Sequence, residues 1–87
     1  MASYKIKWDS QAKKVLNKID KKGAKAILKK VSGLAEDPLI GKPLKGEFKK
    51  YRRLRVGKYR VIYSVLKKII TVQILHVGSR GSVYKTN

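Results

Sequence analysis

Residues 51–77 read YRRLRVGKYRVIYSVLKKIITVQILHV and contain three runs in which apolar side chains alternate with polar ones. Alternation with a period of two is typical of a half-buried β-strand. Short connections between consecutive strands favour antiparallel pairing. We therefore predict three antiparallel strands, with Gly57-Lys58 and Lys67-Lys68 as the connections, over about residues 51–56, 59–66 and 69–77.

The N-terminal half adds one strand and two helices to this prediction. Residues 4–8 show the strand period again. Apolar residues then recur at helical spacing over 12–19 and 24–34, and the short link between the two segments favours a helical hairpin. Residues 38–50 hold both prolines and are predicted to form a loop. The order β-α-α-β-β-β predicts one α+β domain over residues 1–87, with both helices packed on one face of a small twisted antiparallel sheet.

The predicted hairpin assigns side chains to the two faces of the sheet. With a two-residue loop at Gly57-Lys58, Val56 lies opposite Tyr59 and Arg55 lies opposite Arg60. Because side chains alternate, the helices cover an apolar face made of Leu54, Val56, Tyr59, Val61, Tyr63, Val65, Ile70, Val72 and Ile74. The other face carries Arg53, Arg55, Arg60, Ser64, Thr71 and Gln73. Like charges placed opposite each other destabilise a strand pair, so the two paired arginines indicate a phosphate ligand between them.

Positive charge is concentrated in the C-terminal half of the chain. The 87 residues carry a net charge of +18, and residues 48–87 contain eleven Lys or Arg and no Asp or Glu. All five arginines lie there: Arg52, Arg53, Arg55, Arg60 and Arg80. The guanidinium group binds phosphate through a planar fork of donors. The sequence therefore predicts a phosphodiester as the partner.

Other classes of function find no support in the composition. With no cysteine and one histidine the chain offers no transition-metal site, and no glycine-rich nucleotide-binding motif occurs. We expect no metal and no other cofactor. No apolar run approaches the roughly 20 residues that span a bilayer, and the N-terminus lacks the apolar segment of a signal peptide. We therefore expect a soluble cytoplasmic protein with no membrane partner.

A sheet face without carboxylates leaves arginine and tyrosine as the candidate catalytic groups. Arginine stabilises charge that develops on a phosphate, but it is a poor general base because its pKa lies above about 12. Nearby guanidinium groups would lower the pKa of Tyr84 from about 10, so that it could take a proton from a ribose 2′-hydroxyl. Tyr84 could instead stack on a base or pack the tail onto the sheet. His76 falls on the apolar face in the assumed register, where a structural role is favoured over a catalytic one.

Three segments and the element order resemble the RelE/ParE toxin superfamily, and its RelE branch most of all. The segments are Pro43-Leu44-Lys45-Gly46, Arg53-Leu54-Arg55-Val56-Gly57-Lys58-Tyr59-Arg60-Val61-Ile62-Tyr63 and His76-Val77-Gly78-Ser79-Arg80-Gly81-Ser82-Val83-Tyr84. The resemblance covers nearly the whole chain. It implies a toxin of a type II toxin–antitoxin system, a ribosome-dependent endoribonuclease that cleaves messenger RNA in the A site without a metal. In that family the 2′-hydroxyl attacks the adjacent phosphate and leaves a 2′,3′-cyclic phosphate and a 5′-hydroxyl.

The resemblance also implies roles for individual residues. Arg60 would stabilise the transition-state phosphate, Arg80 would lie near the leaving 5′-oxygen, and Tyr84 would orient or deprotonate the 2′-hydroxyl. Two lysines of the best-known member are arginines here, at Arg53 and Arg55, which moves the role of a base onto Tyr84. The RNA phosphates would be bound by Arg53, Arg55, Arg52 and Lys58.

The expected partners are messenger RNA, the ribosome with its RNA, and an antitoxin. The antitoxin is expected to be acidic and partly disordered, and to fold as it wraps the basic surface. Two alternatives stay open, a ParE-like inhibitor of DNA gyrase and a non-catalytic basic RNA-binding module. The fold alone does not separate these functions.

Overall fold

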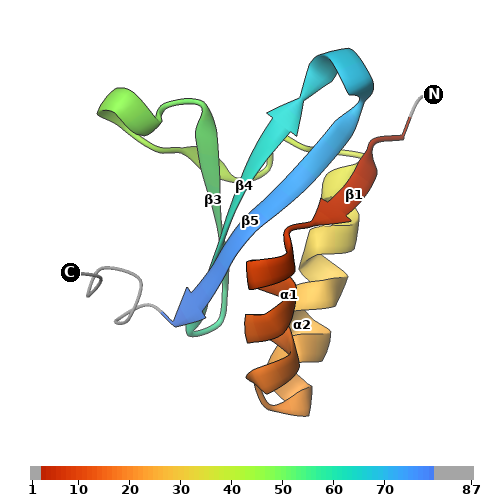
Figure 1. Cartoon of the computed structure of the whole chain (residues 1–87), viewed down its shortest axis with the longest axis vertical. Coiled ribbons are helices and arrows are strands. Elements are labelled where there is room, and N and C mark those ends of the chain that lie inside the picture. Colours follow the sequence, from red (N-terminus) through yellow and green to blue (C-terminus); the bar gives the residue numbers. More distant parts are fainter. Residues whose placement is uncertain (1–2, 80–87) are drawn as a thin grey trace.

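A computed structural model describes residues 3–79 of the chain. Figure 1 shows the two helices side by side against one side of a twisted sheet. The elements in chain order are β1 (Lys5–Trp8), α1 (Ser10–Lys18), α2 (Lys21–Ser32), η1 (Gly33–Ala35), β2 (Lys42–Pro43), η2 (Gly46–Phe48), β3 (Tyr51–Val56), β4 (Tyr59–Leu66), η3 (Lys67–Ile69) and β5 (Thr71–Ser79), the three η elements being short 3-10 turns. The predicted α+β class, with both helices on one face of the sheet, is confirmed.

The sheet is mixed rather than wholly antiparallel. Its strand order is β1-β5-β4-β3-β2, and β1 runs parallel to β5 at one edge. The prediction of an antiparallel sheet is wrong at β1. This strand pairs with β5, and the long connection between them, which includes both helices, allows the two strands to run parallel. The predicted loop over residues 38–50 also contains β2, whose two residues pair with Arg52 and Arg53.

The β3–β4 hairpin has the predicted register. Val56 pairs with Tyr59 and Arg55 pairs with Arg60, and Gly57 takes the positive φ of 59° that this tight turn requires. The next turn is longer than the predicted two residues. It places Leu66 opposite Thr71 and leaves Ile70 42% exposed in the left-handed region, so the prediction that Ile70 lies on the apolar face is wrong.

A β-bulge at Leu75 changes which side chains of β5 face the helices. Tyr63 pairs with Ile74, whereas the preceding residue Ile62 pairs with His76, so Leu75 is the extra residue. One extra residue reverses the alternation of the strand. Val77 is therefore buried, while His76 is exposed on the side away from the helices. The prediction that His76 lies on the apolar face is wrong for this reason.

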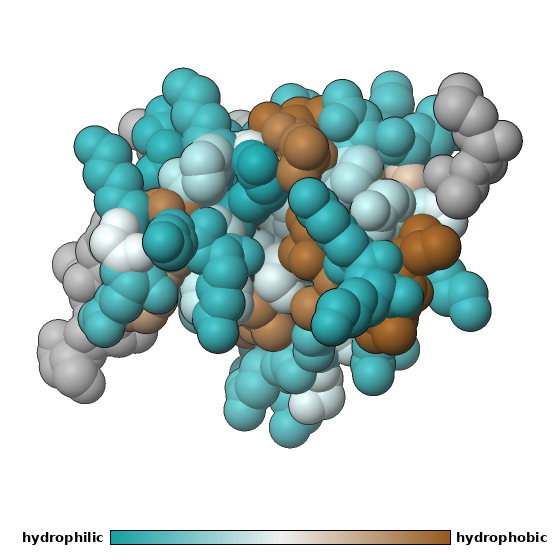
Figure 2. Space-filling model, turned by 90° about the horizontal axis from the view of Figure 1, so that it is seen from above, coloured by the Kyte–Doolittle hydropathy of each residue, from teal (hydrophilic) through white to brown (hydrophobic). Residues whose placement is uncertain are grey.

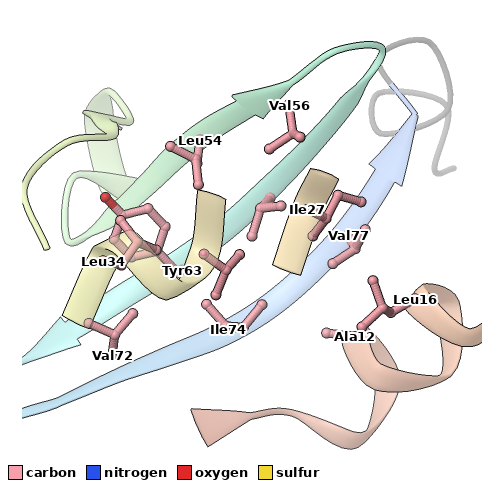
Figure 3. Close-up of a cluster of buried hydrophobic side chains, with 12 residues drawn as sticks. Ala12, Leu16, Ile27, Leu34, Leu54, Val56, Tyr63, Val72, Ile74 and Val77 are labelled. Atoms are coloured by element: carbon pink, nitrogen blue, oxygen red, sulfur yellow. The ribbon is translucent and has the colours of Figure 1, made fainter. Parts of the chain in front are cut away.

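The core lies between the helices and one face of the sheet (Figure 3). Its buried apolar side chains are Ala12, Leu16, Ile27, Val31, Leu34, Leu54, Val56, Val61, Tyr63, Val72, Ile74 and Val77. Both helices begin at an aspartate whose carboxylate accepts from a backbone N–H: Asp9 from Gln11 and Asp20 from Gly23. Within the described residues, no helix is long and apolar enough to cross a membrane.

Three hydrogen bonds hold the segment that leads from α2 to β2 against the sheet. The Tyr63 hydroxyl accepts from the Gly41 N–H at 2.9 Å and donates to the Pro38 carbonyl at 2.8 Å. Arg52 donates to the Gly41 carbonyl. A Cβ at Gly41 would lie 2.6 Å from the Arg53 carbonyl oxygen, so the backbone approaches β3 this closely only because residue 41 is a glycine.

Candidate functional site

The face of the sheet that the helices leave uncovered, called the open face below, presents side chains in rows across the strands. Side chains that are directly opposite in neighbouring strands lie about 5 Å apart, and rows two residues apart are separated by about 7 Å. The first row contains Arg55, Arg60 and Gly78. The second contains Arg53, Ile62 and His76, and the third contains Tyr51, Ser64, Gln73 and Lys7.

Three of the predicted site residues, the catalytic Arg60 and the phosphate-binding Arg53 and Arg55, come together in the first two rows. Arg55 and Arg60 are direct cross-strand neighbours, and Arg53 lies one row away on β3. Residues 48–79 contain no Asp or Glu, so no carboxylate of β3, β4 or β5 offsets these charges. The open face therefore favours an anionic ligand.

Arg60 differs from its neighbours in being buried. Its side chain is 4% exposed, whereas Arg55 is exposed and Arg53 is half-buried. Because its surroundings restrict a buried side chain, Arg60 offers the planar guanidinium fork to an anion in a more fixed geometry than the exposed Arg55 does.

A hollow at the outer edge of β3 extends this basic surface. It has a volume of about 270 Å³ and lies between α2, β2 and β3, lined by Lys30, Ile40, Lys42, Arg53, Leu54 and Arg55. Four of these six residues are cations, so the hollow continues the positive potential of the open face around the sheet edge. Viewed from above, hydrophilic side chains cover most of the described surface, with hydrophobic patches among them (Figure 2).

The other predicted site residues are placed differently. Arg52 lies on the helix-covered side, opposite Tyr63, and its guanidinium donates a hydrogen bond to the Gly41 carbonyl. Lys58 lies in the hairpin turn, with its Nζ 5.5 Å from the centroid of the Tyr59 ring. Arg80 and Tyr84, both predicted to be catalytic, fall outside the described residues. Ser79, the last described residue, pairs with Tyr59.

Two tyrosines of β4 are unsuited to act as bases. Tyr59 donates to an Asp20 carboxylate oxygen at 2.9 Å, and this hydrogen bond raises the pKa of Tyr59. Burial raises the pKa of Tyr63. Both phenols therefore stay protonated at neutral pH, and both point toward the helices. Within residues 3–79, no three His, Asp or Glu side chains are grouped so that they could hold a metal ion.

The third row forms a hollow that the sequence pattern did not predict. This hollow has a volume of about 300 Å³, and its lining includes Lys50, Tyr51, Ser64, Leu66, Gln73 and Leu75. Alternation alone placed Ser64 and Gln73 on the open face. The β3–β4 hairpin pairs Ser64 with Tyr51, whereas the pairing of Gln73 with Ser64 depends on the four-residue turn before Thr71. The apolar pair Ile69-Ile70 of that turn resembles the start of a strand.

Comparison with known proteins agrees with this geometry. The sequence profile of the ParE toxin of type II toxin–antitoxin systems (parDE) matches residues 6–84. The chain belongs to the RelE/ParE toxin family. It is 31% identical to Toxin RelG of Mycobacterium tuberculosis over 84 residues, which cover 94% of this chain and 97% of that relative. It is 30% identical to Toxin RelE of the same organism, over 97% of this chain and 89% of the relative.

Solved structures of RelE toxins share the fold of this family member. The toxin–antitoxin complex RelBE2 of Mycobacterium tuberculosis contains a chain that superposes with a TM-score of 0.82 at 30% identity. The match covers 90% of this chain and 99% of that one. The predicted resemblance to the RelE/ParE superfamily is thus confirmed at the level of the family and of the fold.

Proposed function

We propose that this RelE/ParE toxin is a ribosome-dependent endoribonuclease that cleaves messenger RNA in the A site. The observation that carries the proposal is the gathering of Arg53, Arg55 and Arg60 on an open sheet face whose strands carry no carboxylate. The relatives named RelG and RelE, each matched along nearly its whole length, support the RelE branch.

The chemistry follows from the groups available. The ribose 2′-oxygen forms a bond to the adjacent phosphorus while the bond from phosphorus to the 5′-oxygen breaks, which yields a 2′,3′-cyclic phosphate and a 5′-hydroxyl. Arg60 stabilises the charge on the phosphate, an effect worth about 10²–10³-fold for one well-placed donor. Arg53 and Arg55 hold the phosphates that flank the reacting one.

The proton transfers fall to the C-terminal residues. Since Tyr59 and Tyr63 are held protonated, the proton of the 2′-hydroxyl passes to the phenolate of Tyr84. Arg80 stabilises the leaving 5′-oxygen, which takes a proton from solvent water. Arg52 and Lys58 contribute positive charge nearby. No metal ion takes part in this scheme.

The same charge distribution supports an acidic antitoxin as the resting partner. RelE-type toxins have been crystallised in complex with the antitoxin RelB. A net charge of +18 favours a partner of opposite sign. The antitoxin would neutralise the open face in the cytoplasm until the toxin is released to the ribosome and its messenger RNA.

The match to the ParE profile keeps inhibition of DNA gyrase as a second candidate. The deciding experiment adds purified toxin to translating ribosomes and maps new message ends by primer extension. Wild type is expected to produce ends that Arg80→Ala and Tyr84→Phe lose, while Lys14→Ala, which removes a cation from α1, keeps them. Intact message in every lane together with blocked DNA supercoiling would establish the gyrase alternative. Intact message with RNA binding alone would indicate a non-catalytic module.

A further inference from the structure

The third-row hollow on the open face has features of a small ligand site in its own right. Tyr51 of β3, Ser64 of β4 and Gln73 of β5 lie side by side across three strands. The hollow of about 300 Å³ that they line is at the small end of ligand pockets. Its size suits a single planar ring rather than a folded peptide.

Two polar side chains face this hollow with unused hydrogen-bonding groups. Ser64 is 9% exposed, and within the described residues neither its hydroxyl nor the Gln73 amide bonds to another protein group. A ligand that covers the hollow and hydrogen-bonds to both groups gains specificity over a ligand that covers them and leaves them without a partner. The amide offers both a donor and an acceptor, and the hydroxyl offers either.

An aromatic wall lies beside these polar groups. Tyr51 is half-buried, its ring centroid lies 6.4 Å from that of Phe48, and the Lys50 Nζ lies 5.8 Å from it. Aromatic rings on a sheet surface stack on unpaired bases, and a lysine beside the ring adds attraction for the attached phosphate.

We propose that this hollow binds one nucleobase of single-stranded RNA, stacked on Tyr51 and read at its edge by Gln73 and Ser64. The assignment of that RNA to the cleaved message rests on the proposed function. Four residues of strand separate this row from the Arg55–Arg60 row, a distance of about 13 Å, so one continuous strand of RNA reaches both. The paired donor and acceptor, and the lack of carboxylates over residues 48–79, favour a base over a protein side chain.

The test measures affinity for short RNA by fluorescence anisotropy. The probes are fully 2′-O-methylated hexamers of A, C or U and an abasic hexamer of equal charge, so no cleavage can occur. Tyr51→Ala is expected to weaken binding of the three base-containing hexamers by about 5- to 150-fold, the range expected when one base–aromatic stack is removed, and to leave the abasic hexamer unchanged. Gln73→Leu is expected to narrow the differences among A, C and U. Lys14→Ala on α1 serves as the control and keeps the wild-type base preference.

Three results would overturn the proposal. One is equal affinity of wild type and both variants for every hexamer. Another is an equal loss for the abasic probe, which would show that Tyr51 acts on the backbone or on the fold. The third is unchanged RNA binding with weakened binding of an acidic antitoxin peptide, which would assign the hollow to the protein partner. Tyr51→Leu keeps the apolar volume without the aromatic face, and it replaces Tyr51→Ala if thermal melting shows that variant unfolded.

Translating ribosomes then separate this inference from the proposed function. If Gln73→Leu moves the cleavage sites among codons, the base comes from the message. Unchanged sites with weaker binding to ribosomes indicate a base of ribosomal RNA. Either result supports a base-binding hollow. Absence of cleavage by wild type would refute the proposed function and leave the hexamer result standing as its own test.

Discussion

The two faces of the sheet bury opposite kinds of side chain. The buried strand residues on the helix-covered face are all apolar: Leu54, Val56, Val61, Tyr63, Val72, Ile74 and Val77. The buried strand residues of the open face are Arg60, Ser64 and Thr71, which are all charged or polar. One strand, β4, contributes residues to both sets by simple alternation.

This difference separates stability from function along the same strands. Burial of apolar area on the helix-covered face favours folding by about 25 cal/mol per Å². The like charges of Arg55 and Arg60, placed directly opposite each other, oppose folding. An anionic ligand therefore explains the cross-strand pair of arginines on the open face better than a contribution to stability does.

The largest expected effect comes from two neighbours on β4 that point to opposite faces. Arg60→Ala is expected to slow cleavage of ribosome-bound message by about 10²–10³-fold. Val61→Ala should instead lower the free energy of unfolding by about 1–3 kcal/mol and leave cleavage per folded molecule unchanged. Single-turnover cleavage and urea denaturation of both variants measure the two effects. A cleavage rate of Arg60→Ala within a few-fold of the wild-type rate would contradict the assignment of function to the open face.

A smaller effect is expected where the segment before β2 meets β3. Gly41→Ala should lower the free energy of unfolding by about 1–3 kcal/mol, because the new Cβ meets the Arg53 carbonyl and the Tyr63 hydroxyl. Gly33→Ala is the matched control, since a Cβ there meets nothing within 4 Å. Its unfolding free energy should be unchanged or slightly higher. Equal urea midpoints for the two variants would show that the close approach of the backbone at residue 41 to β3 does not affect stability.

The like-charge pair of Arg55 and Arg60 provides a further test of the difference between the two faces. Arg55→Ala should raise the free energy of unfolding by about 0.2–1 kcal/mol while weakening cleavage, because it removes a cation opposite Arg60. Lys14→Ala is the control, because it removes one cation of α1, which has no cross-strand partner. A loss of stability in Arg55→Ala, measured by urea denaturation, would show that the pair is not repulsive in the free toxin.

The smallest effect concerns a contact on the helix-covered side. The Gly23 N–H and the Tyr59 hydroxyl lower the pKa of Asp20 below its ordinary value near 3.8. The lowered pKa of Asp20 stabilises the folded state when the pH is above the ordinary pKa of the carboxyl group. This contribution is lost as the pH falls through the lowered pKa. Wild type should therefore be more stable than Asp20→Asn at pH 6, and the difference should shrink below pH 4. Thermal melting across that range measures it, and a difference independent of pH would contradict the carboxylate contact.

Much of the fold and part of the site could be predicted from the sequence. The β3–β4 register followed from alternation around Gly57, because a two-residue turn leaves a single pairing. That register is enough to place Arg53, Arg55 and Arg60 on one face of the sheet. The predicted roles of Arg80 and Tyr84 concern residues beyond those that the structure describes.

Other features depend on contacts that local patterns do not contain. Ile69 and Ile70 look like the start of a strand, yet they belong to the turn before Thr71. The bulge at Leu75 adds one residue within a continuous apolar-rich strand, and only the pairing with Ile62 and Tyr63 reveals it. The third-row hollow depends on the four-residue turn, which pairs Ser64 with Gln73, so alternation alone could not identify it.

The most direct test of the open face compares two double variants that remove the same charge. Arg53→Gln with Arg55→Gln removes two cations from the open face, and Lys14→Gln with Lys25→Gln removes two from the helices. The measurement is the salt dependence of the affinity for single-stranded RNA, whose logarithmic slope falls by about 0.7 for each phosphate that the protein no longer neutralises. We expect the slope to fall by about 1.4 for the open-face pair and to stay near the wild-type value for the helix pair. Equal slopes for the two pairs, or a larger decrease for the helix pair, would contradict an RNA-binding role for the open face.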